Sequence, residues 1–439
     1  MKLDTKRTVL VGFAFLAICT FWQMYDNLIP LILTDTFRMN ETLSGAIMAA
    51  DNVLALFLLP LFGGISDRCT SSMGKRRPFI LYGTLAAVVL MMGLPLLADS
   101  YHAAPAQGKL YAFVAVLALL LIAMGTYRSP AVALMPDVTP KPLRSKANAI
   151  INLMGAVGGV TYLIITTFLY RTKSDVYVSY LPLFAIVGGI MLLALAVVMF
   201  FVNEPKLVAR QQKYEQAHPE DQLTQVTENG EVLPKEVKRS LAFLLISIAC
   251  WFIAYNGVTT WFSKYSMKMW DMSLGQANQC MTIATVGAIV SYIPVGNVAS
   301  RLGRRKTIRF GTVLLSGCFA AAFVYTLFFP HFSPVLYVLF ALVGLAWAAI
   351  NVNSLPMVVE MCKGSEVGKF TGLYYTFSMA AQIATPIVAG FLLRNVGYKT
   401  LFPYAAVFAA ISCVTMGFVK HGDNQVTAKK GLEAFDLDD

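Results

Sequence analysis

Three charged side chains lie within long apolar stretches of this 439-residue chain, namely Asp26, Asp51 and Arg128. A charge near the middle of a membrane helix costs about 2.5–3.5 kcal/mol even on a lenient insertion scale, so such residues usually have a function and a partner. A carboxylate there can bind and release a proton, and a nearby guanidinium favours the ionised form. If Arg128 moves, protonation becomes dependent on conformation; the alternative is a static ion pair that orders the helices. Asp51 is either a second proton site or a residue that faces water.

Amides and flat aromatic rings recur at helical spacing in the same stretches. Pairs four residues apart, such as Trp22 with Asp26 and Trp347 with Asn351, share one face of a helix. Sugars present hydroxyls and weakly apolar ring faces, so this mixture of side chains suits a sugar. A single aromatic is more often part of the core, and membrane amides also join helices. The candidate binding residues are Trp22, Gln23, Tyr25, Asn27, Asn152, Trp251, Tyr255, Asn256, Asn351, Tyr375 and Gln382.

The frame that positions these side chains is predicted to be a membrane bundle. The chain is 57% hydrophobic and 13% charged, whereas soluble domains carry about 25% charged residues. A spanning helix needs roughly 20 mostly apolar residues, and the first stretch is too long for a cleaved signal. Twelve such windows occur, with cores near 8–33, 42–65, 79–98, 109–134, 147–170, 179–203, 239–263, 274–298, 308–328, 334–358, 370–393 and 400–419.

The positive charge predicts an orientation and not a polyanionic partner. With both termini in the cytoplasm, 26 of the 35 Lys and Arg residues fall on the cytoplasmic side and eight fall outside. This asymmetry follows the positive-inside rule, so a multi-pass cell-membrane protein is expected and nucleic acid is not. The seven cysteines show no metal-ligand spacing, and no nucleophile–base constellation is evident. An enzyme, a metal and an organic cofactor are therefore not expected.

Two basic loops indicate an internal duplication. Residues 63–79 (GGISDRCTSSMGKRRPF) and 296–306 (GNVASRLGRRK) each follow an apolar stretch and lie 233 residues apart. With an offset of 230, Asp26 falls on Asn256; with 223, Arg128 falls on Asn351 and Asp137 on Glu360. Such repeats are typical of transporters whose substrate site lies at the repeat interface near the bilayer midplane. Amides in the second copy indicate that proton chemistry belongs to the first.

The predicted organisation is two six-helix halves with a polar linker. The first half covers residues 1–203 and the second 238–420. Residues 204–237 form a cytoplasmic linker, of which 206–217 could be an amphipathic surface helix. Residues 421–439 form an acidic cytoplasmic tail.

The first basic loop resembles the signature of the major facilitator superfamily, Gly-x-x-x-Asp-Arg-x-Gly-Arg-Arg, with CTSSM where one residue is usual. That insertion, together with Leu59-Pro60-Leu61 and LMPDVTPKPLRSKANA at 134–149, resembles the sucrose–proton symporters within the broader glycoside–pentoside–hexuronide group. The resemblance implies an all-α fold of twelve helices in two pseudo-symmetric bundles. Because the first and fourth helices line the cavity in this family, it also implies that Asp26 can meet Arg128. Leu59 and Ala55 replace the acids of sodium-coupled relatives, which favours protons.

By the same resemblance, the basic loops form a cytoplasmic gate. Asp67 could cap the N-terminus of a neighbouring helix, while consecutive basic residues at a helix start suit a membrane surface. Ser300 replaces the acid in the second copy, so its latch is expected to be weaker. The gate residues are Gly63, Asp67, Arg68, Gly74, Arg76, Arg77, Asp137, Arg301 and Glu360.

The functional hypothesis is import of a small saccharide, such as a glucoside or disaccharide, by proton symport through alternating access. The protein is expected to act as a monomer in the bilayer, with protons as the coupling ion. Two alternatives stay open: a proton-driven exporter of drugs or other small amphiphiles, and a sugar sensor that does not transport.

Overall fold

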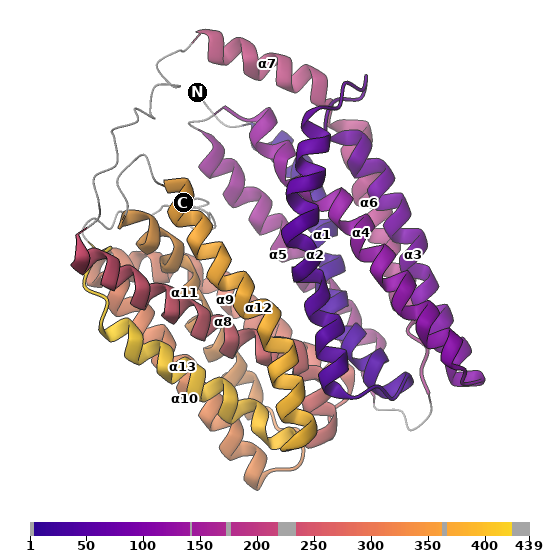
Figure 1. Ribbon diagram of the computed structural model, residues 1–439, viewed down its shortest axis with the longest axis vertical. Helices are drawn as coiled ribbons and strands as arrows, with labels where there is room; N and C mark the ends of the chain where they lie inside the picture. Colours follow the sequence, from indigo (N-terminus) through magenta and orange to yellow (C-terminus); the bar gives the residue numbers. More distant parts are fainter. Residues whose placement is uncertain (1–3, 141–142, 173–176, 218–233, 362–366, 424–439) are drawn as a thin grey trace. The chain divides into compact units, whose positions relative to one another are not determined.

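The computed structural model describes residues 4–140, 143–172, 177–217, 234–361 and 367–423. Within these ranges the chain is helical and contains no strand (Figure 1). Twelve helices are long and apolar enough to cross a membrane, as the sequence predicted. Helices satisfy their own backbone hydrogen bonds, which lipid cannot do for them, so a chain this apolar must fold in this way.

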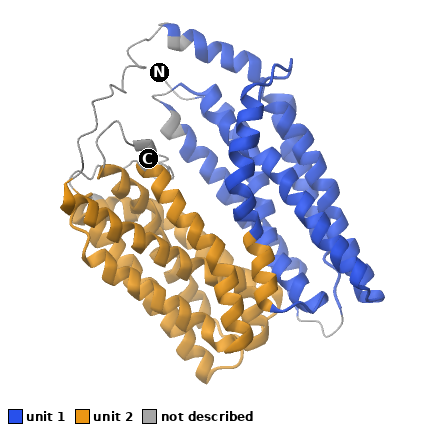
Figure 2. Cartoon of the chain, in the orientation of Figure 1, with its two compact units in different colours: residues 1–40, 50–222 blue, residues 41–49, 223–439 orange. Residues whose placement is uncertain are grey.

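The chain divides into two compact units (Figure 2). In unit 1, α1 packs on α5 and α6, while α3 packs on α4 and α6. Small residues allow the α1–α5 approach, because a Cβ at Gly158 would lie 2.2 Å from the Leu16 carbonyl oxygen. The elements are α1 (Thr5–Leu31), the π-helix η1 (Ile32–Thr36), α2 (Glu41–Asp67), α3 (Arg77–Ala103), α4 (Gln107–Val138), α5 (Arg144–Leu169), α6 (Leu181–Phe201) and α7 (Glu204–Ala217).

Unit 2 repeats the packing of unit 1. Here α8 packs on α12 and α13, while α10 packs on α11 and α13. This correspondence confirms two pseudo-symmetric bundles: α1, α3, α4, α5 and α6 match α8, α10, α11, α12 and α13 in that order. The elements are α8 (Lys235–Met269), α9 (Leu274–Leu302), α10 (Arg304–Phe328), α11 (Val335–Glu360), α12 (Val367–Asn395), the 3-10 helix η4 (Tyr398–Thr400) and α13 (Leu401–Gly417).

The helix α2 is shared by the two units, which differs from the predicted halves. Unit 1 contains residues 1–40 and 50–222, whereas Glu41–Ala49 group with unit 2 (Figure 2). A Cβ at Gly45 would lie 2.1 Å from the Pro386 carbonyl oxygen, so glycine lets α2 approach the α12 backbone. Tyr398 also donates a hydrogen bond to Glu41 at 2.6 Å. Hydrophobic patterning alone does not reveal such backbone packing.

The start of the linker is helical. The expected helix at 206–217 is confirmed as part of α7, which packs against α4 and runs at a steep angle to the spans of unit 1 (Figure 1). Its first residue, Glu204, is buried. Residues 218–233 of the predicted linker and 424–439 of the predicted tail lie outside the described residues.

Candidate functional site

Arg128 on α4 lies in a small pocket of unit 1 together with Asp51 on α2 and Trp22 on α1. Its guanidinium carbon is 5.4 Å from the centre of the Trp22 ring, a cation–π distance. The helices α2 and α4 touch about two turns farther along α2 than Asp51, at Leu58 and Leu59. Ser129 donates a hydrogen bond to the Leu59 carbonyl at 2.8 Å, and Gly125 leaves room for Leu58.

Asp26 on α1 is exposed and lies within electrostatic range of both Asp51 and Arg128. Asp51 is half-buried and accepts a hydrogen bond from the Asn52 amide at 2.9 Å. Among the described residues, no ion pair within 4 Å joins Arg128 to either carboxylate. The structure therefore groups two carboxylates and one guanidinium without a static salt bridge, and the expected Asp26–Arg128 contact stays a prediction for another conformation.

Polar side chains of α1 surround this charge cluster. The Trp22 indole N–H and the Tyr25 hydroxyl are buried without a hydrogen-bond partner in the part of the chain that the structure describes. Asn27, by contrast, is buried and accepts a hydrogen bond from Tyr162 of α5 at 2.8 Å. Gln23 lies beside Gly159 of α5. Buried unpaired donors are rare in folded proteins, so those of Trp22 and Tyr25 stand out, whereas Asn27 already joins two helices.

The corresponding region of unit 2 is aromatic. Tyr255 of α8 stacks on Trp347 of α11 with ring centres 3.8 Å apart and an interplanar angle of 11°. Phe252 meets the edge of the same indole at 5.5 Å. Asn351, one turn beyond Trp347, is hydrogen-bonded by Tyr292 of α9. The α8–α11 contact thus places aromatic rings where the equivalent α1–α4 contact of unit 1 places charges.

The other predicted binding residues do not all join these clusters. Trp251 is only 1% exposed and belongs to the core of unit 2. Tyr375 is exposed, and Gln382 donates to the Ser378 carbonyl one turn away at 3.4 Å. Asn152 is half-buried on α5, and Asn256 has a buried amide nitrogen without a partner among the described residues. Phe252 and Tyr292 were not predicted, although Phe252 is the counterpart of Trp22 at the 230-residue offset.

The first basic loop closes around the Arg76 side chain, which is 7% exposed. Its Nε donates to Asp137 of α4 at 2.7 Å, and its two terminal nitrogens donate to Asp67 and Ser66 of α2. Burial acts to lower the pKa of Arg76, but the Asp137 and Asp67 carboxylates outweigh it and raise that pKa above its ordinary value. Arg76 therefore ties the ends of α2 and α4 to the start of α3. Asp67 serves this arginine and does not cap a helix among the described residues.

The cap on α3 comes from Glu204, which sequence reasoning missed. Its buried carboxylate accepts the backbone N–H groups of Lys75, Arg76 and Arg77 at 2.7, 3.0 and 3.0 Å. A carboxylate at a helix N-terminus satisfies free N–H groups and interacts favourably with the helix dipole. Arg77 in turn donates to the Met199 carbonyl at the end of α6. The end of the sixth span is thus joined to the basic loop.

The second basic loop repeats this arrangement in unit 2. Arg304 pairs with Glu360 of α11 at 2.5 Å, and Arg305 donates to the Gly417 carbonyl at the end of α13 at 2.7 Å. Asp423 accepts the backbone N–H of Arg304 at 2.6 Å and of Arg305 at 3.4 Å. In each loop an arginine therefore pairs with an acid at the end of the fourth or tenth span. In each loop, too, an acid from beyond the sixth or twelfth span accepts backbone N–H groups.

Most predicted gate residues contact one of these two networks. The Gly63 carbonyl accepts from Arg76 at 3.5 Å, and Gly74 has a positive φ of 109° against Glu204. Arg68 and Arg301, which the family signature highlights, are instead exposed. Arg304, Glu204 and Asp423 were missing from the prediction.

Gly74 offers a direct test of the α3 cap. A Cβ at this position would lie 2.4 Å from the Glu204 carboxylate, and its φ of 109° disfavours any other residue. We expect Gly74→Ala to destabilise the protein by about 1–3 kcal/mol, the usual cost of a strained backbone. Thermal unfolding in detergent measures this. Gly64→Ala is the matched control, because nothing lies within 4 Å of a Cβ there; equal unfolding temperatures for the two variants would contradict the tight cap.

The sequence and fold have known relatives. Sucrose transport protein SUC3 of Arabidopsis thaliana is 32% identical over 151 residues, 32% of this chain and 25% of that protein. The chain thus spans about a quarter of the length of that curated relative. An uncharacterized MFS-type transporter of Methanocaldococcus jannaschii is 22% identical over 425 residues, covering 94% of this chain and 95% of that one.

Solved transporters share the fold at low identity. A bacterial homologue of the iron transporter ferroportin in an inward-facing state superimposes with a TM-score of 0.70 and 10% identity, covering 96% of this chain and 100% of that one. The xylose transporter XylE from E. coli superimposes with a TM-score of 0.63 and 13% identity, covering 94% of this chain and 99% of that one. Residues 11–277 and 265–435 match the family profile of the Major Facilitator Superfamily. The chain therefore belongs to the Major Facilitator Superfamily, whose members are transporters and not enzymes.

Proposed function

We propose that this transporter imports a small saccharide together with a proton. The observation that carries the proposal is the cluster of Asp26, Asp51 and Arg128, which lies in the spans of unit 1 without a static ion pair among the described residues. A fixed structural pair would be expected to show direct contact. Charges that stay apart within a membrane bundle are suited to exchange partners during a cycle.

The charge balance of this cluster suggests how a proton is carried. With all three groups ionised the cluster has a charge of −1, and with one carboxylate protonated it is neutral. Charge in the membrane is costly. We therefore expect the loaded carrier to change from outward-open to inward-open with the cluster in its neutral form. In this proposal Asp26 and Asp51 share one proton, while Arg128 neutralises whichever carboxylate is ionised.

Several contacts favour a sugar as the cargo. The half-buried Tyr255–Trp347 stack supplies flat aromatic rings of the kind that pack against sugar rings. Three buried donors without partners among the described residues, on Trp22, Tyr25 and Asn256, can bond to hydroxyl oxygens. The partial sequence likeness to sucrose transport proteins points to the same class of substrate.

The transport cycle follows from these roles. The protein works as a monomer with both termini in the cytoplasm, and sugar and proton enter from outside. The two basic-loop networks hold the cytoplasmic ends of the helices while the site is open outward, and rearrange when it opens inward. No cofactor takes part. The membrane potential supplies about 2.3 kcal/mol per proton charge for each 100 mV.

A proton assay on lightly buffered cells tests this function. We expect sucrose, maltose or another small glucoside to alkalinise the medium of cells that make the protein. Trp347→Ala should raise the half-saturating sugar concentration about tenfold, as expected for loss of one aromatic contact, while Trp347→Phe should keep most of the affinity. Extrusion of a fluorescent dye without sugar-dependent alkalinisation would instead identify a proton-driven exporter. Sugar binding without any flux would identify a sensor.

A further inference from the structure

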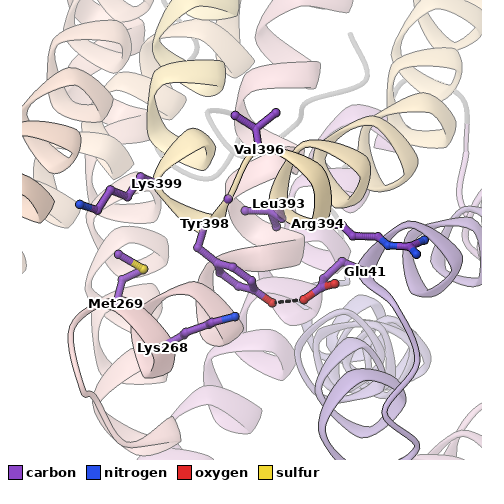
Figure 3. A pocket seen from close by; sticks show the side chains of 9 residues that line it. Glu41, Lys268, Met269, Leu393, Arg394, Val396, Tyr398 and Lys399 are labelled. Atoms are coloured by element: carbon purple, nitrogen blue, oxygen red, sulfur yellow. Dashed lines mark hydrogen bonds between the residues drawn. The ribbon is translucent and has the colours of Figure 1, made fainter.

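A second cavity, of about 500 Å³, lies within unit 2 where several spans end (Figure 3). Its lining residues come from the start of α2, the end of α8, the end of α12 and η4. Glu41 accepts a hydrogen bond from the buried Tyr398 at 2.6 Å, and the Lys268 ammonium lies 3.9 Å from the centre of the Tyr398 ring. These contacts hold Lys268 at the cavity, since a cation over a phenol face is attracted to it.

The cavity has an excess of positive charge. Three cations line it (Lys268, Arg394 and Lys399), against the single carboxylate of Glu41. Among the described residues these cations form no ion pair, because the recorded pairs all involve other basic residues. All three side chains are exposed, and in Figure 3 they reach to different sides of the cavity and do not converge on one point.

The position of the cavity relative to the membrane follows from α2. Glu41 is the first residue of this 27-residue helix and Asp67 is the last, so they are separated by about 40 Å along its axis. The cavity is therefore at the end of α2 opposite Asp67, across the membrane that this helix is long enough to span. In the proposed orientation only eight Lys and Arg residues fall on that outer face, and three of them line this one cavity. Such a concentration runs against the positive-inside rule.

We propose that this cavity binds the headgroup of an anionic phospholipid. The net positive charge of the cavity complements a phosphodiester, because Lys and Arg side chains form charge-assisted hydrogen bonds with phosphate oxygens. The separated cations suit a large headgroup better than a single small anion. Leu393 and Val396 line the same cavity, and Val396 is 67% exposed. These apolar side chains provide the surface that an acyl chain needs and that a soluble anion does not.

The binding of defined lipids to the purified full-length protein tests this site. We expect phosphatidylglycerol to raise the unfolding temperature above the value in phosphatidylcholine with the same acyl chains. Each Lys or Arg removed should weaken phosphatidylglycerol binding about fivefold, and removal of all three should weaken it roughly a hundredfold. Native mass spectrometry of Lys268→Gln, Arg394→Gln, Lys399→Gln and the triple variant measures these losses.

Two controls separate a specific site from general charge. Lys268→Arg keeps the cation and should retain lipid binding. Lys306→Gln removes an exposed lysine from the opposite face and should leave binding as in the wild type. Unfolding temperatures in phosphatidylcholine check that every variant is folded. Equal stabilisation by both lipids, an unaffected triple variant, or equal stabilisation by free glycerol phosphate would each overturn the proposal. None of these outcomes depends on which solute the protein transports.

Discussion

Asp26→Asn is expected to abolish proton-driven accumulation of sugar and to leave sugar exchange intact. The amide cannot carry a proton. The remaining Asp51 and Arg128 charges already cancel, so the carrier is expected to change between its two states with sugar alone. For one proton at 100 mV the wild type can accumulate sugar about fiftyfold, and the variant should not exceed equilibration. Labelled sugar uptake into proteoliposomes with an imposed potential measures the first activity, and counterflow measures the second.

Asp51→Asn distinguishes a shared proton from a single proton site. If the two carboxylates share the proton, this variant should also exchange sugar without accumulating it. Normal accumulation by Asp51→Asn would assign the proton to Asp26 alone. Asp26→Glu is the matched control because it keeps a carboxylate on α1, and it should retain part of the uphill uptake. Intact accumulation by Asp26→Asn, with a normal proton flux, would remove Asp26 from the coupling mechanism altogether.

Glu204→Gln is expected to destabilise unit 1 by roughly 2–4 kcal/mol, because buried hydrogen bonds to a charged group contribute about 1.5–3 kcal/mol each. The carboxylate is 1% exposed and accepts three backbone N–H groups at the start of α3. A glutamine keeps one acceptor oxygen, but its NH2 group replaces the other and would face backbone N–H groups. Arg76 lies at the helix start that Glu204 caps, and the proposed cycle requires its network to rearrange. The variant should therefore lower the maximal transport rate more than the affinity for sugar. Thermal unfolding and uptake kinetics measure the two effects.

The controls for Glu204 use acids of similar type. Glu204→Asp keeps the charge and should recover part of the stability, whereas Glu236→Gln removes an exposed acid and should have little effect. Asp423→Asn should weaken the start of α10 by a smaller amount, since Asp423 accepts one short and one long hydrogen bond. A Glu204→Gln protein with wild-type unfolding temperature and rate would show that the cap is dispensable.

The spans and the two gate acids could be predicted because their signals are local or repeated. Apolar length alone identifies a membrane helix, and all twelve were found. Asp137 and Glu360 were identified through the 223-residue offset, and each meets an arginine of its own basic loop. Glu204 and Asp423 were missed because each follows a span within a polar segment that looks like linker or tail. Their shared position after the sixth and twelfth spans was the available signal.

Helix order predicted only part of the surroundings of Arg128. The expected neighbourhood of the first and fourth helices predicted a contact between Arg128 and Asp26, which stays a prediction. In the structure Asp51 of α2 and Trp22 of α1 share the Arg128 pocket. The partner of Asn27 was also not predicted, since Tyr162 is 135 residues away in the sequence. A spacing of four residues places two side chains on one face, but it does not say which neighbouring helix they meet.

The two acidic caps also set the order in which the basic-loop networks can be completed during synthesis. Arg76 precedes Glu204 by 128 residues, and Arg304 precedes Asp423 by 119. At ~5–20 residues per second the ribosome needs about 6–25 s to make the first of these intervals. Until then α3 has its basic residues in place but no carboxylate at its first N–H groups. The last residues of each half therefore complete its basic-loop network, so neither network can form before its half has been translated.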